Sequence, residues 1–468
     1  MPVQNNGETA RPAEPEKEMR EGVSLLMGDP KKAIIKLSGP MIVAMFLMST
    51  YNIVNAIWVA GLGSDALAAV GFITPLFMIL MGLGNGLGAG TASVISRRIG
   101  AKDKAGADNA AVHAILITLI LSAILTVPLI IFTGPIMTIF GAGDTVGLAT
   151  EYGQVVFLGL VLILFTNIAY AILRAEGDAK RAMYVMAASS LLNMVLDPLL
   201  IYTAGMGIAG AAWGMIISLV MVSCVLLYWF FWKKDTYVTL SYKAFAWDRK
   251  TIRDILGVGV PASTEFFLMA ILAIFINILL VSTAGTDAVA IYTAGWRVVF
   301  FAIIPLVAIG TSVISVAGAA YGARSFEKIR TAHTFSITLG IAISLAISAI
   351  TFIFARQIAV IFTYSADSAH LAPEIALFLA TMCFFYPFVP PGIMSGSIFQ
   401  ATGRGLTSLV ITVLRNLIFI AVFAYLFGIV LGFGEHGVWW GIVAGDICGG
   451  TVAFIWARYY ISRLIANG

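Results

Sequence analysis

The stretch TASVISRRIGAK, residues 91–102, occurs a second time in this chain in altered form. The second copy, TSVISVAGAAYGAR at 311–324, keeps the Ser-Val-Ile-Ser sequence and a later Gly-Ala followed by a basic residue. Two more pairs of similar segments are separated by about the same distance: AILRAEGD (171–178) with SIFQATGR (397–404), and GAAWG (210–214) with GVWWG (437–441). Because each separation is close to half of the 468 residues, the sequence predicts two similar halves in the same order.

The composition indicates which solvent surrounds these halves. Hydrophobic residues make up 60% of the chain, charged residues only 11%, and the mean hydropathy is +0.96. A water-soluble protein of this length could not bury so much apolar surface, so the solvent must be lipid. Twelve apolar segments are long enough to cross about 30 Å of hydrocarbon as helices: 34–62, 66–96, 108–133, 147–173, 180–204, 208–232, 252–283, 287–320, 327–353, 371–402, 405–431 and 437–461. The alternation typical of barrel strands is absent, so we expect an all-α integral membrane protein with twelve transmembrane helices in two six-helix lobes.

The basic residues predict the orientation of the chain in the membrane. Of the 28 Lys and Arg residues, 25 lie in the N-terminal tail, in alternate loops or near the C-terminus, all on one side of the membrane. By the positive-inside rule this side is cytoplasmic, and both termini face the cytoplasm. Six segments per half in the same orientation predict parallel repeats with a site near their interface, as in transporters. The expected domains are a cytoplasmic tail (1–33), an N-lobe (34–232), a cytoplasmic linker (233–251) and a C-lobe (252–468).

Several kinds of chemistry find no support in the sequence. No Walker motif, HExxH, GxSxG or cluster of His and Cys is present, so we expect no enzyme, no metal site and no bound cofactor. Gly82, Gly86 and Gly90 recur at four-residue spacing, but no Lys-Ser/Thr pair of a phosphate-binding loop follows them. We interpret these glycines as a surface on which helices pack closely.

One carboxylate lies at membrane depth in the first half. Asp197, in LLNMVLDPLLIY (191–202), is about seven residues from the outer end of its segment, and Asn55 has the same depth in the first segment. Asn193 lies one turn before Asp197 on the same helix face. Pro198 has no N–H, so a carbonyl oxygen in the preceding turn loses its usual partner. These oxygens favour a proton or a small monovalent cation, and a hydrogen-bonded packing cluster is the alternative.

The second half contains a different set of charged residues at membrane depth: Glu265, Arg297, Arg415 and Asp446. All four lie near the middle of their segments, and two acids can neutralise two bases, as burial in lipid requires. We therefore interpret them as a structural ion network. A second proton-coupling site centred on Glu265 is the alternative.

Several segments together resemble the multidrug and toxic compound extrusion (MATE) family, most closely its archaeal, DinF-like branch. The similar segments cover nearly the whole chain and include GDPKKAIIKLS (28–38), YNIVNAIWVAGLG (51–63), ILRAEGDAKRAM (172–183), LNMVLDP (192–198), IYTAGWR (291–297) and GAAYGAR (318–324). The resemblance implies two six-helix lobes that form a V and expose a site alternately to the two sides of the membrane. It also implies export of amphipathic, often cationic compounds, driven by a proton or sodium gradient.

The resemblance further implies which residues form the site. Asn193 and Asp197 match the acidic site of the N-lobe, and Asn55 stands where this branch usually has a second aspartate. The implied substrate pocket consists of Met48, Tyr51, Asn52, Tyr152, Asn167, Tyr170, Tyr202 and Met215. Of these, Met48 and Met215 stand where the family usually has polar residues.

We therefore expect a multi-pass protein of the cell membrane that works as a monomer. It would contact membrane lipid and small amphipathic substrates, bind no nucleic acid, and use no cofactor beyond H⁺ or Na⁺ as the coupling ion. The alternative is a flippase for a lipid or lipid-linked precursor within the wider MOP superfamily, which Met48 and Met215 favour. A major facilitator also has six plus six segments, but the Gly-x-x-x-Asp that precedes its loop motif is missing before RRIGAKDK (97–104).

Overall fold

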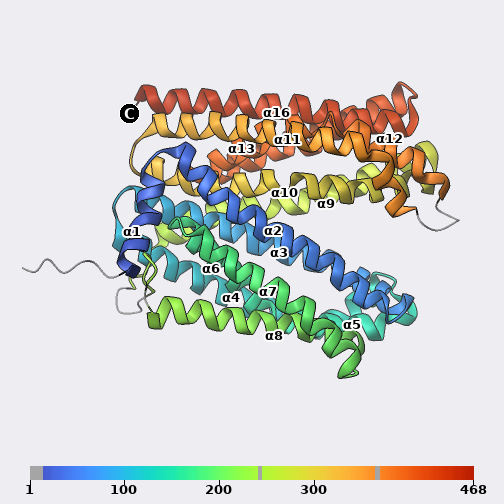
Figure 1. Cartoon of the computed structure of the whole chain (residues 1–468), viewed down its shortest axis with the longest axis horizontal. Helices are drawn as coiled ribbons and strands as arrows, with labels where there is room; N and C mark the ends of the chain where they lie inside the picture. Colours follow the sequence, from blue (N-terminus) through green and yellow to red (C-terminus); the bar gives the residue numbers. More distant parts are fainter. Residues whose placement is uncertain (1–13, 234, 241–244, 364–368, 468) are drawn as a thin grey trace, which may run out of the picture.

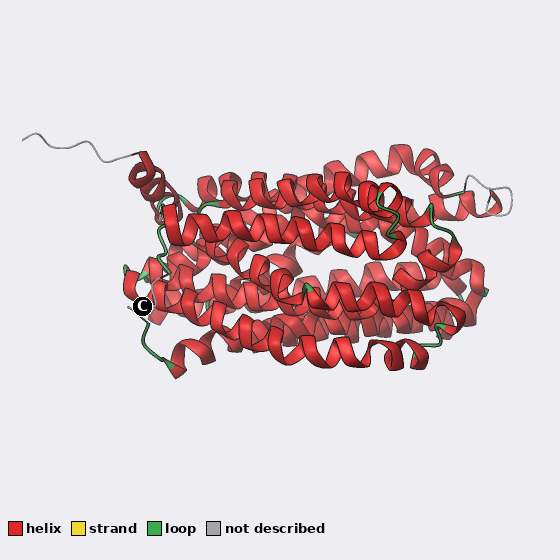
Figure 2. Cartoon of the chain, turned by 90° about the horizontal axis from the view of Figure 1, so that it is seen from below, coloured by secondary structure: helices red, strands yellow, loops and turns green. Residues whose placement is uncertain are grey.

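The computed structural model describes residues 14–233, 235–240, 245–363 and 369–467. All regular structure in these ranges is helical, and short loops connect the helices (Figure 2). Eleven of the described helices are long and apolar enough to cross a membrane, and a bent helix pair supplies a twelfth span. The all-helical membrane fold expected from the composition is confirmed.

The first half of the chain contains the helices α1 to α8. Their bounds are α1 Glu14–Met27, α2 Pro30–Ala60, α3 Ser64–Gly100, α4 Lys104–Ile139, α5 Val146–Leu158, α6 Leu160–Ala175, α7 Ala179–Pro198 and α8 Gly207–Leu227. A 3₁₀ turn precedes α5 (η1, Gly143–Thr145), and π-helical segments follow α7 (η2, Leu199–Thr203) and α8 (η3, Tyr228–Lys233).

The second half contains the helices α9 to α16. Their bounds are α9 Arg249–Ala284, α10 Thr286–Gly322, α11 Phe326–Phe362, α12 Ala372–Met382, α13 Val389–Ala401, α14 Gly405–Thr412, α15 Ala421–Tyr425 and α16 Gly434–Asn467. The 3₁₀ turns η5 (Ala369–Leu371) and η6 (Tyr386–Phe388) precede α12 and α13, and the π-helical segments η7 (Val413–Ile420) and η8 (Leu426–Val430) flank α15.

Aspartates begin four of the long helices. Asp29, Asp103, Asp178 and Asp248 precede α2, α4, α7 and α9, and each accepts a hydrogen bond from a backbone N–H two or three residues later. The first turn of a helix leaves N–H groups without helical partners, and a capping carboxylate satisfies one of them. Short polar side chains at the segment ends therefore determine where these apolar helices start.

Helices α3 and α10 display the internal repeat most clearly. Each contains 37 residues, and each is followed by a basic residue with positive φ, Lys102 at 60° and Arg324 at 53°. These are the only two non-glycine residues with positive φ among the described residues. Because side chains rarely adopt this conformation, its occurrence after both helices supports the repeat inferred from the sequence.

The helices are arranged in two bundles. In Figure 1, α2 to α8 form one bundle, the first lobe, and α9 to α16 form the other, the second lobe. The lobes lie close together near the C-terminus and diverge toward the other end. The main packing between them is that of α3 against α9 and of α10 against α2 and α3.

Three glycines allow the close packing of α3 against α9. A Cβ atom on Gly86 would lie 2.6 Å from the carbonyl oxygen of Gly259, and a Cβ atom on Gly90 would overlap the carbonyl oxygen of Ile255. A Cβ atom on Gly82 would also be too close to a side chain of α9. Only glycine fits at such backbone separations, so the packing interpretation of the three glycines, here called the glycine seam, is confirmed.

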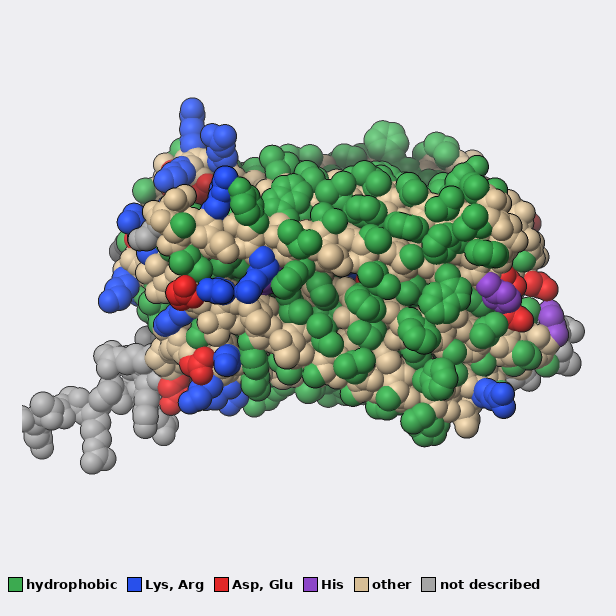
Figure 3. Space-filling model, turned by 90° about the horizontal axis from the view of Figure 1, so that it is seen from above, with side chains coloured by type: hydrophobic (Ala, Val, Ile, Leu, Met, Phe, Trp, Pro, Cys, Tyr) green, Lys and Arg blue, Asp and Glu red, His purple; other side chains and the backbone are tan. Residues whose placement is uncertain are grey.

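The surface divides into three zones along the helices (Figure 3). Lys and Arg side chains gather at one end, hydrophobic side chains cover the middle, and histidines with acidic residues lie at the other end. We call the first end the basic end; α3 turns into α4 there at Lys102, and α10 into α11 at Arg324. At the opposite end α2 turns into α3 at Gly63, and α9 into α10 at Gly285.

Two features differ from the sequence-based expectations. The segment expected as a polar tail contains α1, in which Leu26 is buried and the carbonyl of Met27 accepts a hydrogen bond from Lys328 Nζ of the second lobe. The segment 147–173 is not one straight helix, because α5 and α6 meet at Gly159 with a bend of 46°. A Cβ atom at Gly159 would lie 2.9 Å from the Ile216 side chain, so α8 packs tightly against the bend.

The linker between the lobes is fastened to the first lobe by side chains that accept its backbone N–H groups. Val238 donates to Glu176 Oε2 at 2.9 Å, and Thr239 donates to Asp108 Oδ1 at 2.9 Å. Glu176, which directly follows α6, is buried, and this burial raises the pKa of its carboxyl to about 8 although the Val238 N–H favours the charged form.

Candidate ion and substrate site

Asp197 is fully buried near the end of α7. Its Oδ2 accepts a hydrogen bond of 2.6 Å from Nδ2 of Asn55 on α2. The contact agrees with the prediction that these two side chains share one depth. Because an amide is neutral, Asn55 orients the carboxylate without cancelling its charge.

The second oxygen of Asp197, Oδ1, is buried and has no hydrogen-bond partner among the described residues. It faces Gly214 on α8, where an added Cβ atom would overlap it. Gly214 therefore provides the space that the carboxylate occupies. The sequence analysis did not assign Gly214 to the site, although GAAWG (210–214) was one of the repeated segments.

Asn193 provides another unpartnered oxygen one turn before Asp197. The Asn193 side chain is buried, and its Oδ1 has no hydrogen-bond partner in the described part of the chain. After Pro198 the helix continues as the π-helical segment η2, in which Ala204 N–H donates to the Leu199 carbonyl at 2.8 Å. Such wide turns are frequent at functional sites. Asn193 and Asp197 thus present two free oxygens on one face of α7.

Two tyrosines lie near this carboxylate. The phenol groups of Tyr51 on α2 and Tyr152 on α5 both interact electrostatically with Asp197. Asn52, next to Tyr51, is exposed. Hydroxyl and amide groups can donate to or accept from a ligand, so the two tyrosines supply polar groups near the carboxylate, and Asn52 presents an amide on an exposed part of α2.

No positive side chain among the described residues compensates Asp197. Its interactions within the described residues are burial and the Asn55 hydrogen bond, and no Lys or Arg there forms an ion pair with it. A buried carboxylate without a counter-charge is unfavourable by several kcal/mol unless a proton or a cation neutralises it. The arrangement of oxygens around Asp197 suits either one.

Three residues expected in the substrate pocket have other contacts. Asn167 Nδ2 donates to the Ile163 carbonyl of its own helix at 2.8 Å. Tyr170 is only 7% exposed and belongs to the same buried hydrophobic cluster as Met41. Tyr202 donates to the Trp58 carbonyl near the opposite end of α2. None of the three has a described contact with Asp197; Asn167 and Tyr170 lie on a different helix, α6, and Tyr202 lies in η2 beyond the end of α7.

The two methionines of the expected pocket are partly buried. Met48 packs against the hydrophobic cluster that contains Met41, whereas Met215 packs against the cluster that contains Ile208. Met215 directly follows Gly214, so it lies next to the residue that faces the Asp197 carboxylate.

Asp446, one of the two acidic residues expected at membrane depth in the second lobe, has a charged partner. Asp446 on α16 is fully buried, and its Oδ1 accepts a hydrogen bond of 2.6 Å from Arg415 Nε in η7. Gly392 and Gly449 make room for this pair, because a Cβ atom on either would overlap or crowd the Arg415 side chain. Arg415 thus neutralises Asp446, which gives one ion pair within the set of four charges expected as a network.

Glu265 on α9 has neutral partners. Its Oε1 accepts hydrogen bonds from Ser408 Oγ at 2.8 Å and from Gln400 Nε2 at 3.5 Å. Arg415 acts on Glu265 only through its electrostatic field, without an ion pair. The sequence analysis missed Ser408 and Gln400 as partners; the available signal was the position of Gln400 in the repeated segment SIFQATGR (397–404).

The expected network of four charges is wrong with respect to Arg297. This side chain lies on an exposed face of α10, and no ion pair involving it occurs among the described residues. The prediction rested on depth along the helix axis alone. Depth leaves the direction around the axis undetermined, so Arg297 shares a level with Glu265 and Asp446 without contacting them.

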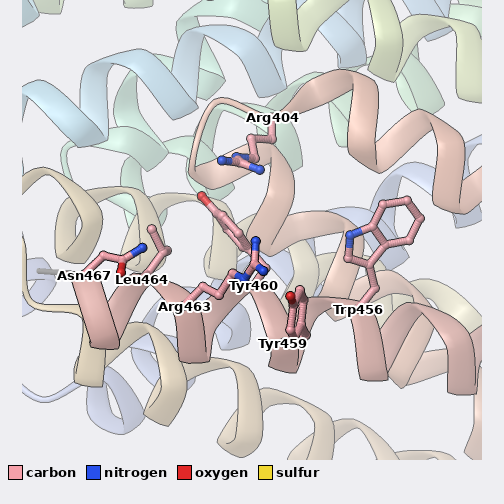
Figure 4. Close-up of a pocket in the computed structure, with 7 residues that line it drawn as sticks. All are labelled: Arg404, Trp456, Tyr459, Tyr460, Arg463, Leu464 and Asn467. Atoms are coloured by element: carbon pink, nitrogen blue, oxygen red, sulfur yellow. The ribbon is translucent and has the colours of Figure 1, made fainter.

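A pocket of about 340 Å³ lies elsewhere, at the basic end of the second lobe (Figure 4). Arg404, from the turn between α13 and α14, has its guanidinium 4.4 Å from the ring centre of Tyr460 on α16. Arg463 stacks in the same way on Tyr459. Neither Asp197 nor Glu265 lines this pocket, so it is distinct from the candidate ion site.

Comparison with protein families gives one match over most of the chain. The model of the family described as MatE matches residues 40–199 and 261–426. Multidrug export protein MepA of Staphylococcus saprophyticus is 28% identical over 420 residues, which cover 89% of this chain and 91% of that protein. MepA of Staphylococcus aureus strain NCTC 8325 is 28% identical over 421 residues, with the same coverage.

Solved structures resemble the whole fold. One, described as the outward-facing conformation of a multidrug resistance MATE family transporter of the MOP superfamily, has a TM-score of 0.93 and 42% identity, covering 95% of this chain and 99% of that one. Another, a MOP superfamily transporter from Pyrococcus furiosus, has a TM-score of 0.91 and 42% identity, covering 95% and 98%. The work on that transporter is described as finding a reverse polarity of its binding pocket that suggests a different function.

Proposed function

Because this chain belongs to the MATE family of membrane transporters, we propose that it exports amphipathic organic compounds by secondary active transport. A proton or sodium gradient supplies the energy, and the two lobes expose the substrate site alternately to the two sides of the membrane. The relatives described as multidrug exporters support this activity.

One observation carries the coupling part of the proposal. Asp197 is fully buried in the first lobe, and its hydrogen-bond partner, Asn55, is neutral. Two buried oxygens on this face of α7, Oδ1 of Asp197 and Oδ1 of Asn193, have no hydrogen-bond partner among the described residues. A proton or Na⁺ bound there would remove the unfavourable buried charge, and its release would restore it. Binding and release of the ion therefore change the energy of this region, which is what an ion-driven transporter requires.

The substrate contacts would come from the polar side chains around the ion site. Tyr51, Asn52 and Tyr152 offer hydroxyl and amide groups, while Met48 and Met215 offer apolar surface. An amphipathic molecule needs both kinds of contact. Three residues of the expected pocket have no described contact with Asp197, and we assign them a role in the packing of the first lobe: Asn167, Tyr170 and Tyr202.

The orientation follows from the basic end. We place it in the cytoplasm because Lys and Arg are retained on the cytoplasmic side of cell membranes. Both termini are then cytoplasmic, the protein works as a monomer in the cell membrane, and it belongs to the archaeal, DinF-like branch of the family. We keep 34–232 and 252–468 as the two lobes; the helix bounds support this division, since α2 to η3 span 30–233 and α9 to α16 span 249–467.

A second candidate function is the translocation of a lipid or a lipid-linked precursor. Met48 and Met215 favour it, since both are apolar residues of the expected pocket and each packs against a hydrophobic cluster. A site with one carboxylate and apolar walls accepts a long hydrocarbon chain more readily than a site with several charges.

Transport by the purified protein in proteoliposomes tests both functions. Efflux of an amphipathic dye is measured under a proton gradient alone, a sodium gradient alone, and neither, and uptake of a labelled lipid is measured in parallel. Gradient-dependent dye efflux without lipid movement is the expected result. Lipid movement without dye efflux would favour the flippase, and the absence of any gradient dependence would contradict secondary transport.

A further inference from the structure

A group of metal-ligating side chains lies at the opposite end of the second lobe, away from the ion site. Glu374 comes from the first turn of α12, and Glu435 and His436 come from the first turn of α16. One ligand atom from each of the three residues lies within 4.8 Å of the others. Glu374 is far from the other two in the sequence, since it precedes His436 by 62 residues, so the sequence analysis predicted no metal site.

The three side chains are already oriented toward one another. His436 Nε2 donates to Glu374 Oε2 at 3.0 Å. Oε2 of Glu435 is buried and has no hydrogen-bond partner among the described residues. A buried carboxylate oxygen without a hydrogen-bond donor is unfavourable. A cation bound to Glu435 Oε2 would remove this cost, which no neighbouring described side chain does.

The packing beneath the group fixes the positions of two ligands. Phe378 lies one turn after Glu374 on α12, and Trp439 lies one turn after His436 on α16; both rings are fully buried. The two rings meet edge to face with centroids 5.3 Å apart, and the His436 ring contacts Trp439 at 4.8 Å. The helix faces that carry Glu374 and His436 are therefore held together by this aromatic contact.

The dimensions suit a small divalent ion. Zn²⁺ binds imidazole nitrogen and carboxylate oxygen at about 2.0–2.2 Å, which places tetrahedral ligand atoms roughly 3.5 Å apart. The Glu374–His436 pair is 3.0 Å apart, about 0.5 Å closer than this, and all three ligand atoms lie within 4.8 Å of one another, so side-chain rotations of about 1 Å bring them to the tetrahedral spacing. An imidazole with two carboxylates favours zinc and similar transition metals over Mg²⁺ or Ca²⁺, which prefer oxygen ligands alone.

The charge of the region also favours a cation. Two carboxylates neutralise one divalent ion, and Asp287 on α10 adds a further negative charge that acts on Glu435. Figure 3 shows histidine and acidic side chains side by side at this end, with hydrophobic surface behind them. Asp287 pairs instead with His370 at 3.3 Å, and both of these side chains are more than half exposed.

We propose that Glu374, Glu435 and His436 form a binding site for a divalent transition-metal ion of the zinc type, which joins α12 to α16 at the end of the second lobe opposite the basic end. Water completes the coordination. The metal–nitrogen bond takes the place of the hydrogen bond between His436 Nε2 and Glu374, and both carboxylates then bind the ion. The bound ion stabilises the pairing of the two helices where they leave the membrane.

Titration of the purified full-length protein with ZnCl₂ tests the site. The protein is purified with an affinity tag that contains no histidine, because a polyhistidine tag would bind Zn²⁺ itself, and is then treated with EDTA and dialysed. Binding is followed by calorimetry and by the midpoint of thermal unfolding. We expect saturable binding of one Zn²⁺ per chain and a higher unfolding temperature in its presence. Glu435→Gln and His436→Gln should each weaken the affinity at least about tenfold, since even residues behind the ligands contribute this much.

His370→Ala is the matched control, because this histidine lies at the same end but outside the group of three. It should bind Zn²⁺ with unchanged affinity. The metal-free unfolding temperature of Glu435→Gln must equal that of the unchanged protein, which separates loss of a ligand from loss of fold. Unchanged affinity in His436→Gln, equal weakening in His370→Ala, or no saturable binding to the unchanged protein would each overturn the proposal.

Discussion

Asp197 in the first lobe and Asp446 in the second lobe are both fully buried in transmembrane helices, but their partners differ. Asp446 receives its hydrogen bond from the Arg415 guanidinium, whereas Asp197 receives one from the neutral amide of Asn55. The repeated halves thus bury a carboxylate in two ways. A fixed cation makes one of them a structural element, and the absence of such a cation leaves the other ready to bind a mobile ion.

The largest effect expected from this comparison is the loss of transport in Asp197→Asn. An amide keeps the size of the side chain and can still pair with Asn55, but it cannot bind a proton or cation as a carboxylate does. We expect gradient-driven dye efflux to fall to the level of protein-free liposomes while the unfolding temperature stays within a few degrees. Asp65→Asn, which alters an exposed carboxylate of the same lobe, is the control and should transport normally. Full efflux by a well-folded Asp197→Asn protein would refute the ion site.

The second prediction concerns the paired carboxylate. Asp446→Asn leaves the Arg415 guanidinium buried without its counter-charge, which costs about 3–5 kcal/mol. We expect a clearly lower midpoint of thermal unfolding in detergent, and partial recovery in the double variant with Arg415→Met, because the unpaired charge is then gone. A double variant no more stable than Asp446→Asn alone would show that the two side chains are not coupled.

Glu265 lies between these two cases, since its partners Ser408 and Gln400 are neutral. Glu265→Gln leaves no charged group unpaired, so we expect a change of at most about 1 kcal/mol in stability, the size of one hydrogen bond. The expected network with Arg297 would instead have required a large loss. Transport should persist, since the coupling is assigned to the first lobe. A thermally normal Glu265→Gln protein that no longer responds to a gradient would place an ion site in the second lobe.

The smallest effect is expected at Glu176, a buried carboxylate outside the membrane segments that also lacks an ion pair in the described residues. Its neighbours Asp178, Arg181 and Tyr237 act on it with partly opposing effects. Burial raises the pKa of Glu176 from 4.5 to about 8, so the folded state holds a proton that the unfolded state has lost. Stability attributable to this group is therefore present below about pH 4.5 and is lost as the pH rises to about 8. Glu176→Gln should show a smaller decrease in unfolding temperature between pH 6 and pH 8.5 than the unchanged protein; an identical pH dependence would contradict the assignment.

The architecture could be predicted from the sequence because lipid restricts the possible structures. A segment that crosses hydrocarbon must satisfy its own backbone groups, so length and hydropathy are nearly sufficient to identify the helices. The duplicated segments predicted the two halves, and the positive φ of Lys102 and Arg324 at equivalent positions supports them. The bend at Gly159 was missed because α5 and α6 are equally apolar and only the packing against Ile216 distinguishes the break.

The site was less predictable, and the reason is geometric. The sequence predicted that Asn55 and Asp197 share a depth, and their side chains meet, but the same reasoning failed for Arg297, which is exposed and forms no ion pair with a described residue. Hydrogen-bond partners such as Ser408 are common residues with no sequence signature. Gly214 is recognisable only once the position of the carboxylate that it faces is known.

The glycine seam has a consequence for how easily the lobes can move against each other. Where side chains from two helices interlock, a relative shift requires them to leave one set of grooves and enter another, and this creates an energy barrier. Along the seam, the Phe266 and Ser263 side chains of α9 fit against Gly82 and Gly86, whereas at Gly90 the two backbones meet directly. Sliding of α3 along α9 would drive these two side chains out of the spaces above the glycines, so we expect the lobes to pivot about the seam rather than slide along it.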